Sequence, residues 1–292
     1  MILVFGSINI DVVVPVPVLP MRGETVLGGD YVLLPGGKGA NQALAARRAG
    51  AQVRMAGAVG TDSFAGLALA NLRHDGVDLE LVRRVERATG CALIMVGGDG
   101  ENLIAVASGA NRQATAASVP DGALTAETIL LCQMEVPAAE NWALFRRARA
   151  AGSRIVLNLA PAAPIDPAIL AEIDILVANE GEATSLGGEP EGLARRLRQA
   201  LVVTRGAAGA NAFLADGSRI DTPALAVQPI DTTGAGDTFV GVLAAGLDRG
   251  LALPLALRHA SAAAGLACLA RGAQSAMPDR AAIEAAVARL PG

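Results

Sequence analysis

The chain has 292 residues, of which 52% are hydrophobic and 18% are charged, with a net charge of −4. This length is near the upper limit of one hydrophobic core, so we expect a single α/β domain over residues 1–292. The acidic balance argues against sequence-independent nucleic-acid binding, which needs a basic surface. An aromatic content of 2% argues against stacking of single-stranded bases. We therefore expect no nucleic-acid partner.

Nothing in the sequence suggests targeting to a membrane. No run approaches the ~18 consecutive apolar residues of a membrane span, and the apolar residues 2–5 follow the first methionine without the basic start of a signal peptide. Cys91, Cys132 and Cys268 are far apart in apolar runs, with neither metal-ligand spacing nor a disulfide framework, so we expect reduced thiols in the core. These features predict a cytoplasmic protein that binds no membrane.

The N-terminal part begins with a strand over 2–5, followed by an extended stretch over 10–19. This stretch contains Val-Pro-Val-Pro, and proline cannot donate a hydrogen bond within a sheet, so a central strand is excluded there. We expect it to pair antiparallel with 25–34, at an edge or outside the main sheet. Next in chain order are a helix over 40–49, a strand over 52–57, a helix over 63–74, and two strands over 91–97 and 102–107 joined by a glycine-rich turn.

From residue 127 onward, strands and helices alternate regularly. Such alternation predicts a parallel sheet covered by helices on both faces. The irregular pieces at about 10–35 and 91–107 do not fit this layering, and we expect them to form a small β lid. The remaining expected elements, in chain order, are strand 128–132, helix 138–151, strands 154–158 and 175–178, short helices within 180–199, strands 200–204, 210–214 and 218–222, and helices near 236–249, 254–270 and 279–289.

The strongest chemical signal is the segment 231–239, which reads DTTGAGDTF and precedes a long apolar helix. A glycine-bearing turn at a helix start presents backbone N–H groups, with the positive end of the helix dipole behind them, to an anion. An aspartate there repels phosphate, unless it removes a proton from a hydroxyl that attacks phosphorus while the amides stabilise the transferred group. The pattern favours this role for Asp237; the alternative is that Asp237 only caps the helix.

A second signal combines Asn9 and Asp11 with the segment 36–41, which reads GGKGAN. Closely spaced Asn and Asp suit the adjacent hydroxyls of a sugar, and the glycines predict a close approach of the backbone to the ligand. Lys38 is the only lysine among 24 basic residues, which suggests that a compact ammonium is needed there rather than charge alone. For the glycine segment, the alternative is that it only forms the start of a helix. For Lys38, the alternative is a lysine retained by chance on a solvated loop. A Walker A loop is excluded, because its first glycine would fall on Val32.

A third signal is the segment 179–182, which reads NEGE and follows the expected strand 175–178. Carboxylates at the carboxyl edge of a parallel sheet suit a hydrated Mg²⁺ near nucleotide phosphates. The alternative is an acidic first turn of a helix, which is favourable for dipole reasons alone.

Together these motifs resemble the ribokinase-like carbohydrate kinases, nearly from end to end. The resemblance implies a three-layer α/β/α sandwich with a mostly parallel central sheet and a small β-sheet lid, and it implies an ATP-dependent sugar kinase. The segments that carry it are 6–11 (GSINID), 36–43 (GGKGANQA), 100–102 (GEN), 109–111 (GAN), 158–162 (NLAPA), 179–183 (NEGEA), 231–239 and 271–274 (RGAQ).

The resemblance also implies a role for individual residues. Asp237 would be the general base, with an anion hole formed by the amides of Gly234, Ala235 and Gly236, and Asn179 and Glu182 would serve Mg²⁺ and phosphate. The residues that match sugar-binding positions are Asn9, Asp11, Gly37, Lys38, Asn41 and Glu135. Those that match nucleotide-binding positions are Thr204, Arg205, Gly206, Ala207, Ala208 and Gly209, together with Gly236 and Ser261.

The resemblance further implies an activating potassium ion and a homodimer that pairs through the lid. The matching cation positions are Asp231, Thr233, Ala267, Ala270 and Gly272, and most of them serve through backbone carbonyls. The family has a serine as the final ligand, where this chain has Ala276, with Ser275 displaced by one residue. That departure puts one contact of the potassium site in doubt.

The lid sequence bears on the substrate. Nucleoside kinases of this family stack the base on aromatic side chains, but the lid pieces here offer only Tyr31, and 91–107 has no aromatic residue. A free pentose fits better, and we expect D-ribose, phosphorylated on its 5-hydroxyl; 2-deoxyribose, fructose, adenosine and pseudouridine remain alternatives. A sugar sensor without catalysis is disfavoured because Asp237 is present. A dinucleotide oxidoreductase is disfavoured because residues 6–9 lack the G-x-G-x-x-G spacing.

Overall fold

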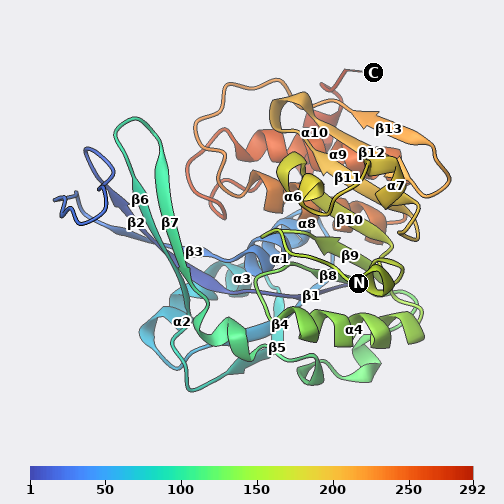
Figure 1. Ribbon diagram of the computed structural model, residues 1–292, viewed down its shortest axis with the longest axis horizontal. Coiled ribbons are helices and arrows are strands. Elements are labelled where there is room, and N and C mark those ends of the chain that lie inside the picture. Colours follow the sequence, from blue (N-terminus) through green and yellow to red (C-terminus); the bar gives the residue numbers. More distant parts are fainter. Residues whose placement is uncertain (292) are drawn as a thin grey trace.

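A computed structural model describes residues 1–291, and within them nine strands form the larger of two sheets (Figure 1). In chain order these strands are β1 (Ile2–Phe5), β4 (Val53–Val59), β5 (Asp78–Arg84), β8 (Ile129–Cys132), β9 (Arg154–Asn158), β10 (Ile175–Asn179), β11 (Ala200–Thr204), β12 (Ala210–Leu214) and β13 (Arg219–Thr222). Their order across the sheet is β13-β12-β11-β10-β9-β8-β1-β4-β5. The sheet is parallel from β5 to β11, and β12 pairs antiparallel with both β11 and β13.

Helices cover both faces of this sheet, because its strands are apolar on both sides. Successive residues of a strand face opposite sides, and β1 accordingly buries Ile2 and Val4 in one core and Leu3 and Phe5 in the other. The first core is covered by α1 (Lys38–Arg48), α2 (Ser63–Ala68), α3 (Ala70–His74), α8 (Ala235–Asp248), α9 (Leu253–Ala267) and α10 (Arg280–Val287). The second is covered by α4 (Ala138–Ala150), α5 (Pro167–Leu170), α6 (Glu180–Ser185) and α7 (Pro190–Ala194). The α/β/α sandwich is thereby confirmed.

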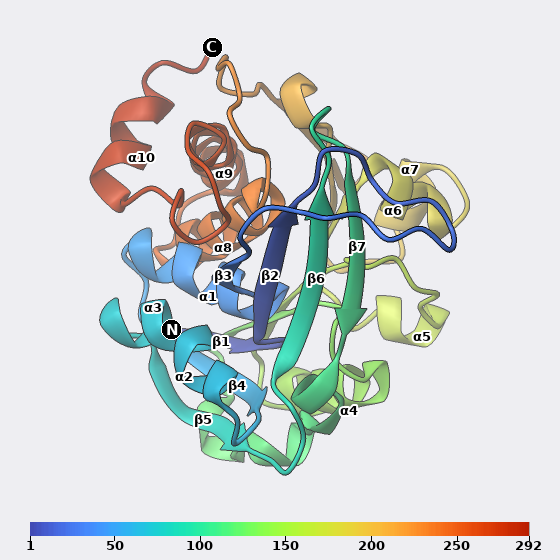
Figure 2. The same ribbon diagram turned by 90° about the vertical axis from the view of Figure 1, so that its left-hand side faces the viewer.

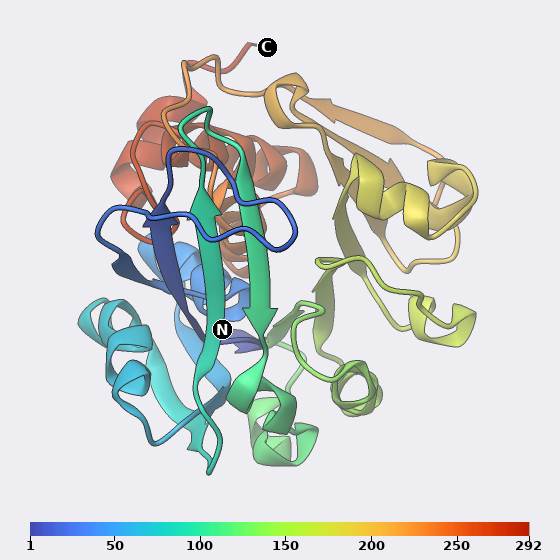
Figure 3. The same cartoon turned by 60° about the vertical axis from the view of Figure 1, so that its left-hand side comes forward.

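The smaller sheet, called the lid here, is formed by β2 (Asn9–Pro15), β3 (Val32–Gly36), β6 (Gly90–Val96) and β7 (Asn102–Ala107). Its order is β3-β2-β6-β7, with β2 and β6 parallel and the outer pairs antiparallel. Figure 2 looks onto the lid, whose strands lie side by side in front of the rest of the chain. Figure 1 shows the lid from the side, projecting from the body, and Figure 3 shows it from an intermediate direction. Every residue of β7 is exposed, including Leu103, Ile104 and Val106.

Most of the expected elements are present, with several differences in their bounds and number. Strand β5 was not expected, because it lies at the edge of the sheet and its half-exposed sequence DLELVRR lacks the apolar run of a central strand. The expected helix over 63–74 is divided into α2 and α3 at Leu69. Within 25–34 only the end is a strand, because β3 begins at Val32, and the four-residue helix α5 was not expected.

The three cysteines are free thiols, but their surroundings differ. Cys132 is fully buried in β8, and burial raises the pKa of its thiol above the usual range. Cys91 and Cys268 are half-buried, so the expected core position is confirmed for Cys132 alone. In the described part of the chain, residues 1–291, no helix has the length and apolar character needed to cross a membrane.

Candidate active site

Polar residues gather where the parallel strands of the larger sheet end. Asn158 and Asn179 are the last residues of β9 and β10, Thr204 is the last residue of β11, and Gln133 directly follows β8. The carboxyl ends of parallel strands lie at one edge of a sheet, and open α/β sheets bind their ligands at this edge. Motifs that are far apart in the sequence are therefore placed beside one another.

The glycines before helix α1 allow it to pack closely against the segment that follows β1. Gly37 has a φ of +88°, and a Cβ there would lie 2.8 Å from the backbone nitrogen of Asn9. A Cβ at Gly39 would lie 2.6 Å from the backbone nitrogen of Ser7, and the N–H of Ala40 donates to the Ser7 carbonyl at 2.9 Å. The sequence predicts a close approach of these glycines to a ligand, but the close contact in the structure is with the chain itself.

Asp237 lies in the first turn of α8 and is buried. Its Oδ2 accepts a hydrogen bond from Nδ2 of Asn41 at 2.9 Å, and its Oδ1 accepts one from Nε2 of Gln42 at 3.0 Å. Both donors come from the N-terminal half of α1. In the described residues no side chain caps α8. The Asp237 carboxylate is directed to the neighbouring helix α1 rather than to α8, so the structure does not show Asp237 as a cap.

The turn before α8 is held by close packing on one side and is open on the other. Gly234 has a φ of +75°, and a Cβ there would lie 2.7 Å from the Cβ of Ala273. A Cβ at Gly236 would meet no heavy atom of the described residues within 4 Å. The N–H of Ala235 donates to the Thr232 carbonyl at 3.2 Å. Of the three predicted anion-hole residues, Gly236 therefore faces the most open space.

A cavity of about 400 Å³ lies between the lid and the carboxyl edge of the larger sheet. It is bordered by the predicted sugar-binding residues Asn9, Lys38 and Glu135. Cavities of this size suit small ligands. The other lining residues come from β7, from the segment that follows it, and from the loops after β8 and β9: Val106, Ser108, Asn111, Arg112, Met134, Val136, Pro137 and Pro161.

Hydrogen bonds hold several of these cavity residues in place before any ligand binds. Oε2 of Glu135 accepts from the Ser7 hydroxyl at 2.5 Å and from the Lys38 N–H at 3.0 Å. Oδ1 of Asn9 accepts from Nδ2 of Asn111 at 2.6 Å. Because each contact joins segments that are far apart in the chain, the polar wall of the cavity is part of the folded core rather than a loose loop.

Four carboxylates surround the single lysine. Burial and, to a smaller extent, the charges of Glu135 and Asp237 raise the pKa of Asp11 to about 6, against the opposing charge of Lys38. Burial acts to lower the pKa of Lys38, but the charges of Asp237, Glu135, Glu182 and Asp11 outweigh it, so this pKa lies above its usual value. Lys38 is therefore a firmly protonated ammonium at the centre of an acidic group of side chains.

The predicted Mg²⁺ residues form a capping box at the start of α6. Oδ1 of Asn179 accepts from the Glu182 N–H at 2.8 Å, and Oε2 of Glu182 accepts from the Asn179 N–H at 2.8 Å. Such reciprocal bonds satisfy two free amides of a helix start. Asn179 is exposed and Glu182 is half-buried. Within residues 1–291, no three His, Cys, Asp or Glu side chains form a metal cluster.

The predicted nucleotide-binding residues lie mainly on the surface. The segment 204–209 runs from the end of β11 through a short 3-10 helix, and Nε of Arg205 lies 3.3 Å from Oε1 of Glu180 at the start of α6. Ser261 is buried in α9, and its hydroxyl donates to the Pro223 carbonyl at 2.6 Å. The segment 204–209 is thus next to α6, whereas the hydroxyl of Ser261 is engaged within the protein.

The predicted cation residues meet in the segments before α8 and after α9. Oδ1 of Asp231 accepts from the N–H and the hydroxyl of Thr233 at 2.9 and 2.6 Å, and Oδ2 accepts from the Gly272 N–H at 2.8 Å. Burial acts to raise the pKa of Asp231, but these hydrogen bonds outweigh it and hold the pKa below its usual value. The Asp231 N–H also donates, at 3.3 Å, to the carbonyl of Cys268, which follows Ala267. Asp231 is therefore a fixed carboxylate.

The serine of the final cation position is not replaced by a neighbouring hydroxyl. Ser275 donates its hydroxyl to the Arg271 carbonyl at 2.7 Å, across a turn that contains Gly272 with a φ of +86°. Ala276, which takes the position of the family serine, offers no side-chain oxygen. Any cation held here would depend on Asp231 and on backbone carbonyls such as that of Ala270.

Sequence reasoning missed a set of buried amide side chains around Asp237. Nε2 of Gln42 lies 2.9 Å from Oδ1 of Asn158, and Oε1 of Gln42 accepts from Nε2 of Gln133 at 2.7 Å. Nε2 of Gln274 donates to Oδ1 of Asn41 at 3.0 Å. A signal was available for Gln133 and Asn158 only, which stand at or just after the end of a buried strand; Gln42 lies within α1 and Gln274 between α9 and α10.

Three comparisons with known proteins agree along nearly the whole chain. A family model described as pfkB family carbohydrate kinase matches residues 1–280. The ribokinase of Bacillus subtilis is 37% identical over 288 residues, which cover 97% of this chain and 98% of that protein. A ribokinase structure from Thermotoga maritima has a TM-score of 0.91 with 30% identity, covering 98% of this chain and 99% of that one. The structure of Arabidopsis thaliana ribokinase complexed with ribose and ATP has a TM-score of 0.89 with 32% identity, covering 98% of both chains.

Proposed function

The chain belongs to the pfkB family of carbohydrate kinases, and we propose that it transfers the γ-phosphate of ATP to the 5-hydroxyl of D-ribose. The observation that carries this proposal is the buried Asp237 carboxylate, held by Asn41 and Gln42 at the start of a helix whose glycine turn is open at Gly236. A fixed acceptor beside the backbone amides of an open turn is suited to removing a proton while phosphate charge is stabilised.

In the proposed reaction Asp237 accepts the proton of the sugar 5-hydroxyl. The hydroxyl oxygen forms a bond to the γ-phosphorus as the bond from that phosphorus to the bridging oxygen breaks, and its electron pair leaves with ADP. The amides of Gly234, Ala235 and Gly236 stabilise the charge on the transferred phosphoryl group. The Ala235 amide, which donates to Thr232 in this structure, would turn to the phosphate on binding.

The sugar is proposed to lie in the cavity beside Lys38, with its 5-hydroxyl toward Asp237. Asp11 and Glu135 accept hydrogen bonds from sugar hydroxyls, and Asn9, Asn41 and Lys38 donate, since amides and ammonium groups supply the complementary polarity. Gly37 takes part through its backbone. What supports this arrangement is that Asn9, Lys38 and Glu135 border one cavity and that Asp11 and Asp237 lie close enough to influence the pKa of Lys38.

The nucleotide is proposed to lie along 204–209, with its phosphates toward α6 and the turn before α8. Ser261 is included on the resemblance alone, because its hydroxyl is bonded to Pro223. Asn179 and Glu182 would hold Mg²⁺ through its waters, and the ion would neutralise charge on the phosphates. The fit is supported by Glu182, whose charge is close enough to affect the pKa of Lys38.

We propose a potassium site beside Asp231, with Thr233, Ala267, Ala270 and Gly272. The depressed pKa of Asp231 supports it, because the side chain stays ionised and can attract a cation. The ion would stabilise the loop before α8 and the loop after α9. Because Ala276 supplies no hydroxyl, activation is expected to be weaker than it would be with serine there.

The lid favours a free sugar over a nucleoside, and it suggests a dimer. Tyr31 is 63% exposed and directly precedes β3, and it is absent from the cavity lining, so it offers a base no stacking surface there. By the register of β6 and β7, Leu93 and Leu103 lie on one face of the lid, whereas Ile104 and Val106 lie on the other, where Val106 borders the cavity. Leu93 and Leu103 leave the first face apolar and exposed, and we propose that the lid of a second copy covers it. A wild type that sediments as a monomer would contradict the dimer, and a Leu103→Asp variant that remains a dimer would contradict this interface. We also propose that the chain forms a single domain and that it acts in the cytoplasm.

The experiment that tests the function is ADP release from Mg·ATP with ribose, 2-deoxyribose, fructose, adenosine and pseudouridine, each with and without potassium. Ribose is expected to give the highest kcat/KM, with an increase in potassium. A nucleoside or another sugar as the preferred acceptor would contradict ribose as the substrate. The position of the new phosphate on the product, read by phosphorus–carbon coupling in NMR, decides between the 5-hydroxyl and the others.

A further inference from the structure

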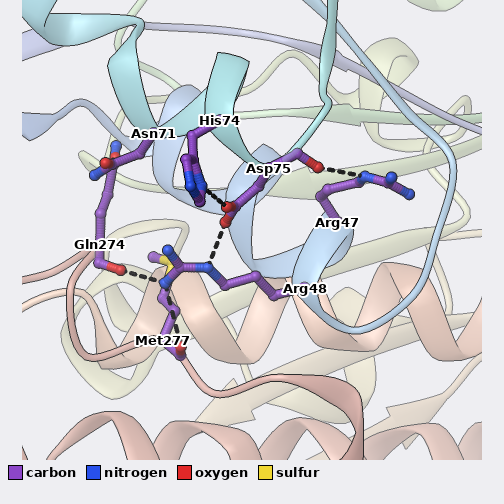
Figure 4. A network of polar contacts seen from close by, with 7 residues as sticks. All are labelled: Arg47, Arg48, Asn71, His74, Asp75, Gln274 and Met277. Carbon is purple, nitrogen blue, oxygen red and sulfur yellow. Dashed lines mark hydrogen bonds and ion pairs between the residues drawn. The ribbon is translucent and has the colours of Figure 1, made fainter.

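Gln274 lies between α9 and α10 and is buried, with 2% of its surface exposed. Nε2 of its side chain donates to Oδ1 of Asn41 at 3.0 Å, and its Oε1 accepts from Nδ2 of Asn71 at 3.0 Å. Figure 4 shows the side chain of Gln274 reaching toward Asn71, while its backbone carbonyl contacts Arg48. Both ends of this side-chain amide are thus occupied in one orientation.

The contact with Asn41 has a consequence for Asp237. The oxygen and nitrogen of a side-chain amide exchange places when the group turns by half a rotation, and neighbouring hydrogen bonds decide between the two orientations. Because Gln274 donates to the oxygen of Asn41, the nitrogen of Asn41 faces Oδ2 of Asp237 at 2.9 Å. The opposite orientation would place an amide oxygen against a carboxylate oxygen, which is repulsive.

We propose that Gln274 is a positioning residue, which holds the Asn41 amide in the orientation that supports the Asp237 carboxylate during phosphate transfer. This inference rests on the proposed function, in which Asp237 takes up the proton of the sugar. A carboxylate whose oxygen is turned away from the incoming hydroxyl accepts its proton less efficiently. Loss of Gln274 therefore acts on turnover through Asn41, although Gln274 does not border the cavity.

The other oxygen of Asp237 has an independent support of the same design. Nε2 of Gln42 donates to Oδ1 of Asp237 at 3.0 Å, and Nε2 of Gln133 donates to Oε1 of Gln42 at 2.7 Å. Each carboxylate oxygen is thus bonded to an amide of α1 that is itself oriented by a more distant glutamine. Because the Gln133 side remains intact, a change at Gln274 is expected to reduce turnover without abolishing it.

A simpler role for Gln274 would be to fasten its own segment to the core. That role is also served by Arg48, whose Nη1 donates to the carbonyls of Gln274 and Met277 at 2.5 and 3.2 Å (Figure 4). Arg48 holds the same segment by its backbone and has no part in orienting Asn41. The two residues therefore separate fastening of the segment from orientation of the amide.

The experiment compares Gln274→Met, Gln274→Glu and Arg48→Met, with kcat measured at saturating D-ribose and Mg·ATP and with the melting temperature measured for each. Gln274→Met removes the donor at similar volume and is expected to lower kcat by about tenfold or more. Gln274→Glu is expected to lower it further, because a carboxylate accepts from Asn41 and turns the amide oxygen toward Asp237. Arg48→Met is expected to lower the melting temperature and to keep kcat within about threefold.

The outcomes distinguish three cases. Retention of kcat by Gln274→Met, or a higher kcat for Gln274→Glu than for Gln274→Met, would overturn the inference. An equal loss of kcat in Arg48→Met would also overturn it, because fastening of the segment would then explain the effect. A wild-type protein that does not phosphorylate ribose would contradict the proposed function, and it would do so whatever the variants show.

Discussion

The sugar half and the nucleotide half of the candidate site are built differently. Around Asp237 the polar side chains are buried and contact one another across large sequence separations, as Asn41 does with Asp237 and Gln274. Around α6 and segment 204–209 the polar side chains are exposed or half-buried, and Asn179 and Glu182 bond to each other within one helical turn. The first region is organised by the fold, and the second by local sequence.

This difference indicates what holds the side chains of each half in position. Buried polar groups need complete hydrogen bonding, so a change in one of them disturbs its partners. An exposed capping box exchanges its bonds with water at little cost, so it can rearrange when a nucleotide and its metal ion bind. We therefore expect substitutions in the sugar half to affect catalysis strongly, and substitutions in the nucleotide half to have smaller effects.

The largest effect is expected from Asp237→Asn. The amide cannot accept the proton of the sugar hydroxyl, and kcat should fall by about 10²-fold or more. Affinities for ribose and for ATP, measured by calorimetry, should stay near the wild-type values because the side chain keeps its shape. A variant that kept more than about a tenth of the wild-type kcat would show that Asp237 is not the base.

Lys38→Met should raise the KM for ribose by about tenfold, with a smaller decrease in kcat, because a hydrogen bond from a charged donor contributes ~1.5–3 kcal/mol. The matched variant Lys38→Arg keeps the charge but not the compact ammonium, and the same loss is expected from it. Steady-state kinetics at varied ribose test both. An unchanged KM in Lys38→Met would place Lys38 outside sugar binding, and full activity in Lys38→Arg would show that charge alone suffices.

A smaller effect, dependent on pH, is expected from Asp11→Asn. The pKa of Asp11 is about 6 in the folded protein, raised by burial and by neighbouring carboxylates. The folded wild type therefore takes up a proton more readily than the unfolded chain, and it gains stability as pH falls through about 6 toward the ordinary aspartate pKa of 3.8. Asp11→Asn lacks the buried charge, so its melting temperature should exceed the wild-type value at pH 7.5, and this advantage should shrink toward pH 5. A constant difference across that range would contradict the assignment.

The smallest effect is expected from Asn179→Ala. Loss of the cap should lower the free energy of unfolding by ~1 kcal/mol, measured by urea denaturation. Asp166→Ala is a matched control, because Asp166 caps α5 through the Ala168 N–H at 2.8 Å and lies outside the proposed site. A KM for Mg·ATP that rises in Asn179→Ala alone supports a role at the nucleotide. If the KM for Mg·ATP is the same in both variants, Asn179 acts only as a helix cap.

Much of the fold could be predicted because most strands of the larger sheet are short apolar runs between helices. Strands β1, β9, β11 and β12 have the predicted bounds, since each is buried and is followed by turn residues. Strand β5 could not be predicted, because an edge strand buries one side only and its arginines interrupt the apolar pattern. Such a segment becomes a strand by pairing with a neighbouring strand, and its local sequence does not show that neighbour.

The candidate site likewise contains some residues that the sequence predicts and others that it does not. Asp237, Lys38 and Asn41 stand in glycine-rich segments whose chemistry is readable from spacing. Gln133 and Gln274 are single amides in otherwise apolar or irregular segments, and their partners lie 91 and 233 positions away. No spacing rule connects residues so far apart, so only the fold shows that they orient the amides of α1.

The single lysine has a practical consequence for chemical labelling. Lys38 is the only side chain with a primary amine, and it borders the cavity. Because its pKa lies above the usual value, acylating reagents should modify it slowly at neutral pH and faster in alkali. Ribose in the cavity should slow the reaction further, and peptide mass mapping would follow it separately from acylation of the N-terminal amine. The unaltered chain thus contains its own reporter of whether the cavity is filled.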